Sequence, residues 1–285
     1  MIQLDIGSFE LSLNNSPYVI AEIGSNFDQD YEKACKLIEM AKECGANAVK
    51  FQLFNAEALY PNKDDLYKVF KEIELHSSWI PKLKECTELN NLDFLASAFD
   101  PYSFKILEEN NVIAHKIASS ETTNLGFISK VAKAGKPILI STGMCDFIDV
   151  EEAINIAYAE NNFKICIMQC ASVYPLNHKD ANLNVIKSYL KRYPHIVGFS
   201  DHTLDNIAAV TAVGLGARIF EKHITLDKKA KGPDHFYAME PQEFKSYVFA
   251  IKNAFDCLGS NNKFLLDEER KVGRREGLYL KREIK

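Results

Sequence analysis

Eight short apolar runs, rich in β-branched residues, recur along the chain and alternate with segments whose apolar residues follow a helical period. The runs span residues 18–24, 48–54, 93–99, 114–120, 137–143, 164–170, 195–202 and 218–224. Strict alternation of strands and helices predicts a parallel sheet, and eight repeats over about 200–250 residues match the size of a (β/α)8 TIM barrel. An open doubly wound sheet is the alternative, but it usually has a glycine-rich first turn, whereas the first turn here reads "EIGSN". We therefore predict the α/β barrel.

Two shorter segments are expected outside the barrel, which we assign to residues 17–260. The opening "IQLDIGSFELSL" alternates in polarity around a Gly-Ser turn, which predicts a β-hairpin within residues 1–16. We expect this hairpin to cover the bottom of the barrel. Residues 261–285 are predicted to form a tail, and residues 55–75 lengthen the connection after the second strand.

Composition excludes several classes of protein. The formal net charge is −5 and no block of Lys and Arg stands out, which argues against nucleic-acid binding. No apolar run approaches the roughly 18 residues of a membrane span, and the start of the chain lacks the features of a signal peptide. Seven cysteines without a CxxC spacing predict reduced thiols rather than a zinc cluster. These features predict a cytoplasmic protein whose partners are small molecules, not nucleic acid or membrane.

Polar residues gather at the ends of the predicted strands, which is where barrel enzymes keep their chemistry. The polar residues at or just beyond the carboxyl ends of the runs are Glu22, Lys50, Gln52, Lys116, Ser119, Glu121, Ser141, Thr142, Gln169, Tyr174, His202 and His223.

Side-chain alternation shows which way several of these residues should point. In "AVKFQLF", Lys50 and Gln52 share one face, and the apolar residues that alternate with them share the other. Because the apolar face must meet the helices, Lys50 is predicted to point into the barrel, where a buried lysine needs a partner or an anionic ligand. The same parity places Glu22 and His202 on inward faces.

Each of these residues also has a purely structural explanation. A histidine at a strand end can be a hydrogen-bonded core residue, Lys50 and Glu22 can form an ion pair inside the barrel, and Ser141-Thr142-Gly143 can be a turn. Their convergence at one end of one barrel favours a functional site instead.

The residue types in this set point to a particular chemistry. Two imidazoles on adjacent strands, His202 and His223, suit a divalent metal with open positions. Two lysines with Ser and Thr hydroxyls suit a phosphate, and two carboxylates, Glu22 and Glu121, are available for acid–base work. Together they suit carbon–carbon bond formation between a phosphorylated donor and a carbonyl compound. A Schiff-base aldolase with an imine-forming lysine is the alternative, but it has no use for the paired histidines.

Seven short motifs carry a resemblance to a known family. In chain order they read "AEIGSNF", "AVKFQ", "KIASSE", "ILISTGM", "SDHT", "FEKHITLD" and "GPDH". This series resembles the sialic acid synthase family, which includes N-acetylneuraminate, legionaminic acid and pseudaminic acid synthases and spore-coat polysaccharide proteins. The likeness runs from about residue 17 to about residue 245.

The resemblance implies a reaction and a role for each matching residue. The reaction is condensation of phosphoenolpyruvate with an N-acetylated amino-hexose, giving a nine-carbon 2-keto-3-deoxy acid and phosphate. The metal, Mn²⁺ or alternatively Mg²⁺ or Co²⁺, would bind His202 and His223 and polarise the sugar's aldehyde. The phosphoenolpyruvate positions fall on Lys50, Lys116, Ser119 and Ser141, with Ser172 where the family has a phosphate-holding asparagine. The sugar positions fall on Glu22, Gln52, Tyr174 and Asp234, while Glu121 matches a glutamate beside the reacting centre. The proton handler is either Glu22 or Glu121.

The chain also departs from the family pattern. It reads "KIASSE" and "QCASVYP" where N-acetylneuraminate synthases read closer to KIGSGE and HCTNxYP, which leaves the sugar open between N-acetylmannosamine and a diacetamido-trideoxyhexose. Family members usually continue into an antifreeze-like domain that lends an arginine to the partner subunit of a homodimer. Here residues 261–285 offer Arg270, Arg274, Arg275 and Arg282 without a complete domain of that kind. The expected partners are therefore a second copy of the chain and a separate antifreeze-like domain, and a catalytically weak sugar-binding relative is the further alternative.

Overall fold

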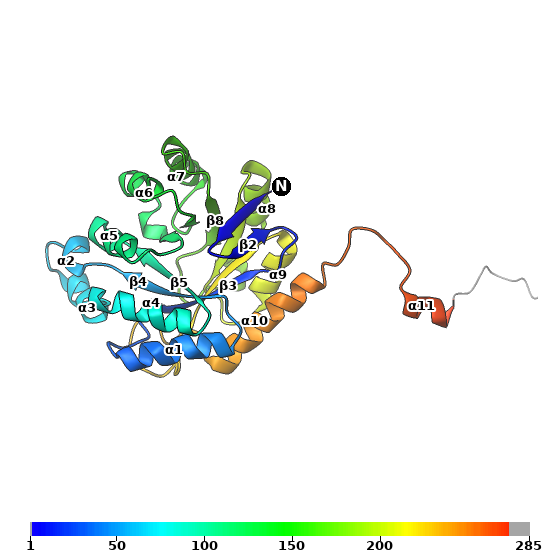
Figure 1. The fold of residues 1–285 in the computed structure, drawn as a ribbon, viewed down its shortest axis with the longest axis horizontal. Helices are drawn as coiled ribbons and strands as arrows, with labels where there is room; N and C mark the ends of the chain where they lie inside the picture. Colours follow the sequence, from blue (N-terminus) through cyan, green and yellow to red (C-terminus); the bar gives the residue numbers. More distant parts are fainter. Residues whose placement is uncertain (1, 274–285) are drawn as a thin grey trace, which may run out of the picture.

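The computed structural model describes residues 2–273 and contains a closed barrel of parallel strands (Figure 1). The eight strands follow one another around the barrel in chain order, and β10 closes it by pairing with β3. Their bounds are β3 (Tyr18–Gly24), β4 (Ala48–Leu53), β5 (Asp93–Ala98), β6 (His115–Ile117), β7 (Ile138–Ser141), β8 (Ile165–Cys170), β9 (Ile196–Asp201) and β10 (Ile219–His223). The predicted TIM barrel is confirmed.

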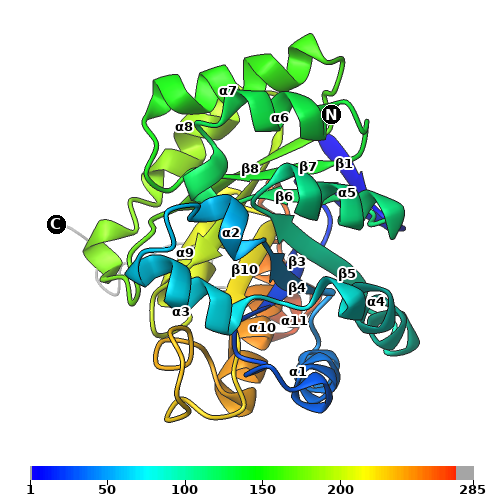
Figure 2. The same cartoon turned by 90° about the vertical axis from the view of Figure 1, so that its left-hand side faces the viewer.

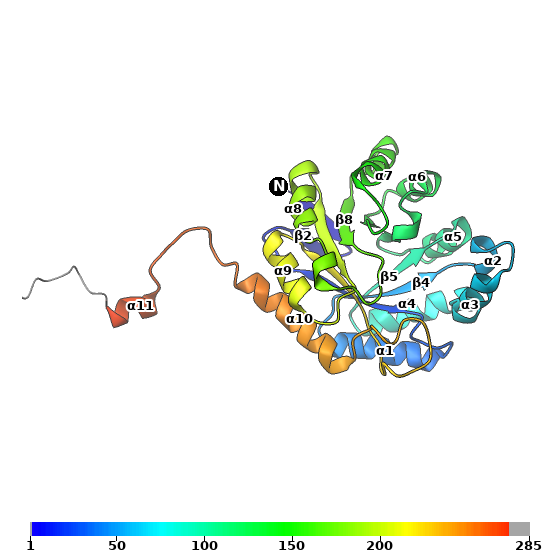
Figure 3. The ribbon, with the colours of Figure 1, turned by 180° about the vertical axis from the view of Figure 1, so that it is seen from behind.

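A helix follows each strand, and the helices form a layer around the barrel (Figure 2). The main helices are α1 (Tyr31–Glu43), α4 (Ile80–Leu89), α5 (Pro101–Glu109), α6 (Leu125–Ala132), α7 (Phe147–Ala159), α8 (Asn184–Arg192), α9 (Ile207–Leu215) and α10 (Pro241–Asp256). Two further short helices, α2 (Ala56–Leu59) and α3 (Asp65–Ile73), occupy the long connection after β4. The caps match the sequence: the Asp30 side chain accepts from two amides at the start of α1, and Gly45 follows its end with a φ of +86°. Along one flank, α8, α9 and α10 lie side by side (Figure 3).

The N-terminal hairpin closes one end of the barrel, as the sequence predicted. It consists of β1 (Gln3–Ile6) and β2 (Phe9–Ser12), which pair antiparallel around Gly7 and Ser8. Leu4, Ile6 and Leu11 of the hairpin are buried and pack against apolar side chains inside the barrel. We call this set of inward-facing residues the lower layer: Tyr18, Ile20, Ala48, Leu95, Ala114, Leu139, Cys166, Met168, Ile196 and Ile219.

Further along the same strands the inward-facing side chains change character. We call the polar inward-facing set the charged layer: Glu22, Lys50, Ser97, Lys116, Ser141, Ser200 and Glu221. The outward faces of the strands remain apolar along most of their length and pack against the helices, with Val49, Phe51, Phe199 and Phe220 among them. The barrel therefore has an apolar interior at the hairpin end and a polar interior at the other end.

Some details differ from the sequence expectation or lie beyond it. The fourth barrel strand ends at Ile117, and the chain then forms a 3₁₀ turn at Ser119–Glu121, held by the Thr122 hydroxyl against the carbonyl of Ser141 (2.7 Å). Helix α11 (Asp267–Val272) stands apart from the barrel (Figure 1). Of the predicted tail, residues 274–285, including Arg274, Arg275 and Arg282, lie outside the described residues. Among residues 2–273 we find no helix long and apolar enough to cross a membrane.

Candidate active site

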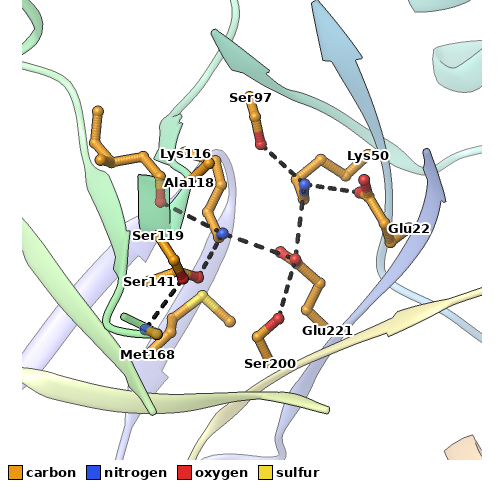
Figure 4. Close-up of polar contacts among 12 residues, drawn as sticks. Glu22, Lys50, Ser97, Lys116, Ala118, Ser119, Ser141, Met168, Ser200 and Glu221 are labelled. Atoms are coloured by element: carbon orange, nitrogen blue, oxygen red, sulfur yellow. Dashed lines mark hydrogen bonds and ion pairs between the residues drawn. The ribbon is translucent and has the colours of Figure 1, made fainter. Parts of the chain in front are cut away.

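Two buried lysines face one buried glutamate at the centre of the charged layer (Figure 4). The Nζ atoms of Lys50 and Lys116 lie 3.6 and 3.7 Å from the same oxygen, Oε1 of Glu221. That oxygen also accepts a hydrogen bond from the Ser200 hydroxyl at 3.3 Å. Glu221 thus supplies a negative charge that both buried lysines share.

Each lysine has a second, closer set of partners. Lys50 Nζ lies 2.7 Å from Oε2 of Glu22 and donates to the Ser97 hydroxyl at 2.9 Å. The other oxygen of Glu22 accepts from the Gln52 amide at 2.9 Å, so this carboxylate is held from both sides. Lys116 Nζ donates to the Ser141 hydroxyl at 2.6 Å (Figure 4). The predicted inward orientation of Lys50 is therefore observed. Lys116 points inward as well, and the partners of the two lysines come from four other strands.

A tight polar cradle lies beside Lys116, at the turn after β7. The amide of Gly143 donates to the Ser119 hydroxyl at 3.0 Å. A Cβ atom at position 143 would lie 2.8 Å from that hydroxyl and 2.5 Å from the Ser172 hydroxyl, closer than real Cβ contacts allow. Only glycine lets the two serines approach this backbone, and the resulting group of hydroxyls and an amide is suited to the oxygens of an anion.

The two carboxylates of the cluster differ in protonation. Burial raises the pKa of Glu22 to about 7, with Lys50 opposing the shift and the negative charge of Glu221 adding to it. Burial would also raise the pKa of Glu221, but the cations Lys116 and Lys50 outweigh it and lower that pKa to about 2. Near neutral pH, Glu221 is therefore a fixed anion, while Glu22 can take up or release a proton.

The two lysines also differ in the direction of their pKa shifts. Burial lowers the pKa of Lys116, although Glu221 opposes the shift. Burial acts on Lys50 in the same direction, but Glu22 and Glu221 together raise its pKa above the ordinary value. Lys50 is thus the more firmly charged of the pair.

His202, directly after β9, and His223, the last residue of β10, lie one step above the charged layer, with ring centroids 5.9 Å apart. The Nδ1 atom of His202 lies 2.7 Å from the carbonyl oxygen of Ala171, which leaves its Nε2 for another partner. Nδ1 of His223 is buried and has no hydrogen-bond partner among the described residues. Burial lowers the pKa of both imidazoles to about 4, so both are neutral, which is the form that binds a metal.

These two imidazoles fit a divalent metal in an open site. Within residues 2–273, no three His, Cys, Asp or Glu side chains are grouped so that they could hold an ion by themselves. The protein would therefore supply two imidazole nitrogens, and substrate or water would complete the coordination. An orphaned buried ring nitrogen on His223 and an oriented ring at His202 are consistent with this chemistry.

An aromatic wall stands beside the histidines. The Tyr174 ring lies 4.1 Å from the His202 ring and 5.0 Å from the Tyr237 ring, measured between centroids. Asp234 lies against this wall, because its carboxylate accepts from the Tyr237 hydroxyl at 2.6 Å and from the amide and hydroxyl of Ser25. The loop after β10 is thereby tied to the loop after β3.

A cavity of about 360 Å³ joins the charged layer to the histidines. Nine of the residues predicted from the sequence line it: Lys50, Gln52, Lys116, Ser119, Ser141, Ser172, Tyr174, His202 and His223. Three others lie off the cavity wall. Glu22 is fully buried behind Lys50, Asp234 lies behind Tyr237, and the partly exposed Glu121 carboxylate accepts from the Asn124 amide at 3.3 Å.

Three polar residues of this site were not predicted from the sequence. Glu221 and Ser97 line the cavity, and Ser200 contacts Glu221. The signal for Glu221 was present in the sequence, because it shares the parity of His223 on β10. Phe70, which also lines the cavity, comes from α3 in the long connection after β4 and has no comparable signal.

A known protein family matches most of the chain. The model of the NeuB family matches residues 37–263, which is well over half of the chain. The chain belongs to the NeuB family.

Several relatives of this NeuB-family chain are named as sugar-acid synthases. It is 36% identical over 270 residues to an N,N'-diacetyllegionaminic acid synthase of Legionella pneumophila, covering 88% of this chain and 76% of that protein. It is 38% identical over 264 residues to the human N-acetylneuraminate-9-phosphate synthase, covering 87% of this chain and 73% of that protein. The resemblance inferred from the seven motifs is confirmed.

A solved structure of the family has the same fold. The N-acetylneuraminic acid synthetase of Leptospira borgpetersenii, in complex with citrate, superposes with a TM-score of 0.89 at 29% sequence identity. The match covers 95% of this chain and 94% of that one. As a NeuB-family barrel with a polar cavity at the carboxyl ends of its strands, the chain is an enzyme of the sugar-acid synthase class.

Proposed function

We propose that this enzyme condenses phosphoenolpyruvate with an N-acetylated amino-hexose, forming a nine-carbon 2-keto-3-deoxy acid and releasing phosphate. The observation that carries the proposal is the pair of buried lysines beside the Gly143 cradle, directly beneath two neutral histidines. The two lysines and the Gly143 cradle suit an anionic donor. The two histidines suit a metal that binds a carbonyl acceptor. The sialic, legionaminic and pseudaminic acid synthases among the relatives support the same product class.

Binding of the donor, phosphoenolpyruvate, is assigned to the charged layer. Lys50 and Lys116 carry two positive charges, and Glu22 and Glu221 offset them when both are ionised. A highly charged anion entering this neutral cluster would favour protonation of Glu22, whose pKa of about 7 already places it near the balance point. Lys116, Ser119, Ser141 and Ser172 would hold the phosphate and carboxylate oxygens, and Lys50 would contribute its charge beside them.

Binding of the acceptor sugar is assigned to the residues around His202 and His223. A bound Mn²⁺, Mg²⁺ or Co²⁺ would supply Lewis-acid polarisation of the sugar's aldehyde. His202 and His223 would hold that ion, while Tyr174 and Gln52 would line the sugar-binding space and Asp234 would support it through Tyr237.

Proton transfer is assigned to Glu22 in this proposal. The aldehyde oxygen gains a proton during condensation, and the water that enters the product loses one, so a group near neutrality is needed. Glu22 has the raised pKa and contacts Gln52 and Lys50, both of which reach the cavity. Glu121 is the alternative proton handler, at the edge of the site.

Phosphate release tests the proposal directly. The enzyme is incubated with phosphoenolpyruvate and, in turn, N-acetylmannosamine and a diacetamido-trideoxyhexose, with and without a chelator. We expect phosphate release that depends on one of the sugars, stops with chelator and returns with Mn²⁺. His202→Ala and His223→Ala should lose metal binding and remain folded. Full activity in chelator would contradict the metal assignment, and no release with any amino sugar would contradict the reaction.

A Schiff-base aldolase remains the second candidate, because burial lowers the pKa of Lys116 as an imine-forming lysine requires. Borohydride reduction in the presence of a ketoacid distinguishes the two. A covalent adduct on Lys116 together with activity in chelator would favour the aldolase. No adduct and chelator-sensitive phosphate release would favour the synthase.

A further inference from the structure

A second buried ion pair lies on the outer face of the barrel, directly behind the two histidines. Lys222 and Asp201 are each 1% exposed, and Lys222 Nζ lies 3.5 Å from Asp201 Oδ2. The two residues are paired in the register of β9 and β10. Each is the chain neighbour of a histidine that points the other way, into the cavity: Asp201 precedes His202, and Lys222 precedes His223.

The same two strands show what ordinary packing at this face looks like. Two residues earlier, the register pairs Phe199 with Phe220, and both are fully buried in the apolar layer under the helices. Burying two charges at the next position of that face carries a desolvation cost that an apolar pair would avoid. Polar pairs of this kind are best known for fixing register and geometry rather than for adding stability.

The contacts of the pair enclose His202. Asp201 Oδ1 accepts from both the amide and the hydroxyl of Thr203 at 2.8 Å. Lys222 Nζ donates to the carbonyl oxygen of Thr203, so the residues on both sides of His202 are held from one point on β10. The backbone that carries His202 is thereby fixed relative to the strand that carries His223.

Tyr247 of α10 covers the pair from outside. The Lys222 ammonium lies 5.5 Å from the centroid of its ring. The Tyr247 hydroxyl and Asp201 Oδ2 are both buried, and neither has a well-formed hydrogen bond among the described residues. The pair is thus shielded from water and can act as a rigid link between the two strand ends.

We propose that Lys222 and Asp201, enclosed by Tyr247, are positioning residues that set the spacing and orientation of His202 and His223. The inference rests on the proposed function in one respect, namely that the two histidines bind a divalent metal. No contact between this pair and substrate is involved. Outer contacts that orient metal-binding imidazoles commonly alter metal affinity by about 10–100-fold when removed.

Three variants and one matched control test the proposal. Lys222→Met removes the cation with similar side-chain length, and the double variant Asp201→Leu/Lys222→Met leaves no lone buried charge that could unfold the barrel. Tyr247→Phe removes the covering hydroxyl alone. The control is Phe220→Leu, which perturbs the same face of the same strand two residues earlier. Mn²⁺ affinity is measured by electron paramagnetic resonance titration, and thermal unfolding verifies that each variant is folded.

We expect Mn²⁺ binding to weaken about 10–100-fold in Lys222→Met and in the double variant, with a smaller effect in Tyr247→Phe and less than about a twofold change in the control. A second readout needs no metal: in histidine-labelled protein, the Nδ1–H signal of His202, held by the Ala171 carbonyl, should weaken or shift in the double variant. A folded double variant with native Mn²⁺ affinity and an unchanged His202 signal would overturn the proposal. If the unmodified protein binds no Mn²⁺, the proposed metal site fails, and the His202 signal alone then decides the positioning role.

Discussion

The lower layer and the charged layer occupy the same inward face of the same strands, yet the first stabilises the fold and the second forms part of the candidate site. On β3 the inward residue changes from Ile20 to Glu22, and on β10 it changes from Ile219 to Glu221. Two residues along a strand correspond to about 7 Å. Within that distance the interior passes from an apolar core covered by the hairpin to a group of four buried charges.

The difference shows how the barrel separates stability from chemistry. Lower-layer side chains contribute apolar burial and have no unmet polar groups, so they can stabilise the fold at no cost in function. Charged-layer side chains are costly to bury and are held only because each ionised group has a partner within 4 Å. Changes in the lower layer should therefore alter the free energy of unfolding, whereas changes in the charged layer should alter donor binding.

The largest effect is expected from the hairpin. Leu11→Ala removes a fully buried hairpin side chain that packs against the lower layer and should reduce the free energy of unfolding by about 2–5 kcal/mol, because the cavity it leaves can collapse only in part. The Michaelis constant for phosphoenolpyruvate should stay within about twofold, since the site lies on the far side of this layer. Denaturant unfolding and steady-state kinetics measure both quantities. The control, Leu13→Ala, truncates an exposed leucine nearby and should change neither; a donor constant that rises with the loss of stability would break the separation.

The converse change is Lys116→Met. It removes a charge-assisted contact worth about 1.5–3 kcal/mol, so the Michaelis constant for phosphoenolpyruvate should rise tenfold or more, up to about a hundredfold. The free energy of unfolding should fall less than in Leu11→Ala, because the buried cation is costly in the free enzyme. Lys105→Met, at an exposed lysine of α5, serves as the control and should leave the donor constant unchanged. An unaltered donor constant in Lys116→Met would make this lysine a structural residue.

A smaller effect on donor binding is expected at the cradle around Gly143. Gly143→Ala places a methyl group against the hydroxyls of Ser119 and Ser172 and should raise the donor constant about tenfold, equivalent to about 1.4 kcal/mol. The matched control is Gly214→Ala, because position 214 lies within α9 and has open space around its Cβ direction. That variant should keep native kinetics and gain slightly in stability. Native donor binding in Gly143→Ala would show that the cradle does not contact the donor.

The last prediction concerns the pH dependence of stability at the hairpin end, and its effect within any one pH unit is small. Burial lowers the pKa of His195, next to the start of β9, to about 4, below its ordinary value of about 6.5. The unfolded chain therefore binds the proton first, and stability falls as pH drops from about 6.5 to about 4. His195→Gln should make this fall shallower by at most about 1.4 kcal/mol per pH unit, which is the slope for one proton. Urea unfolding at several pH values measures it, and an unchanged slope would contradict the assignment.

The sequence predicted the barrel well because its signals are local. Eight apolar runs and the alternation around Lys50 depend only on near neighbours in the chain, and so does the hairpin turn at Gly7. Contacts between loops could not be predicted in this way. Asp234 is held by Ser25, more than 200 residues away, and Phe70 reaches the cavity from α3 in the long connection after β4. The role of Glu221 as the shared anion depends on two lysines from other strands, so parity could place it inside the barrel but could not reveal its partners.

The hairpin plug also has a kinetic consequence. Leu4, Ile6 and Leu11 seal one end of the barrel, so ligands reach the cavity from the end where the strands finish. Lys50 and Glu221 lie two residues closer to the hairpin end than Gln52 and His223 on the same strands. A sugar bound beside Gln52 and His223 would therefore lie between the bound donor and the solvent. On the proposed assignment, turnover is sequential and ordered: phosphoenolpyruvate binds first, the sugar second, and a sugar that arrives early forms a dead-end complex that appears as substrate inhibition.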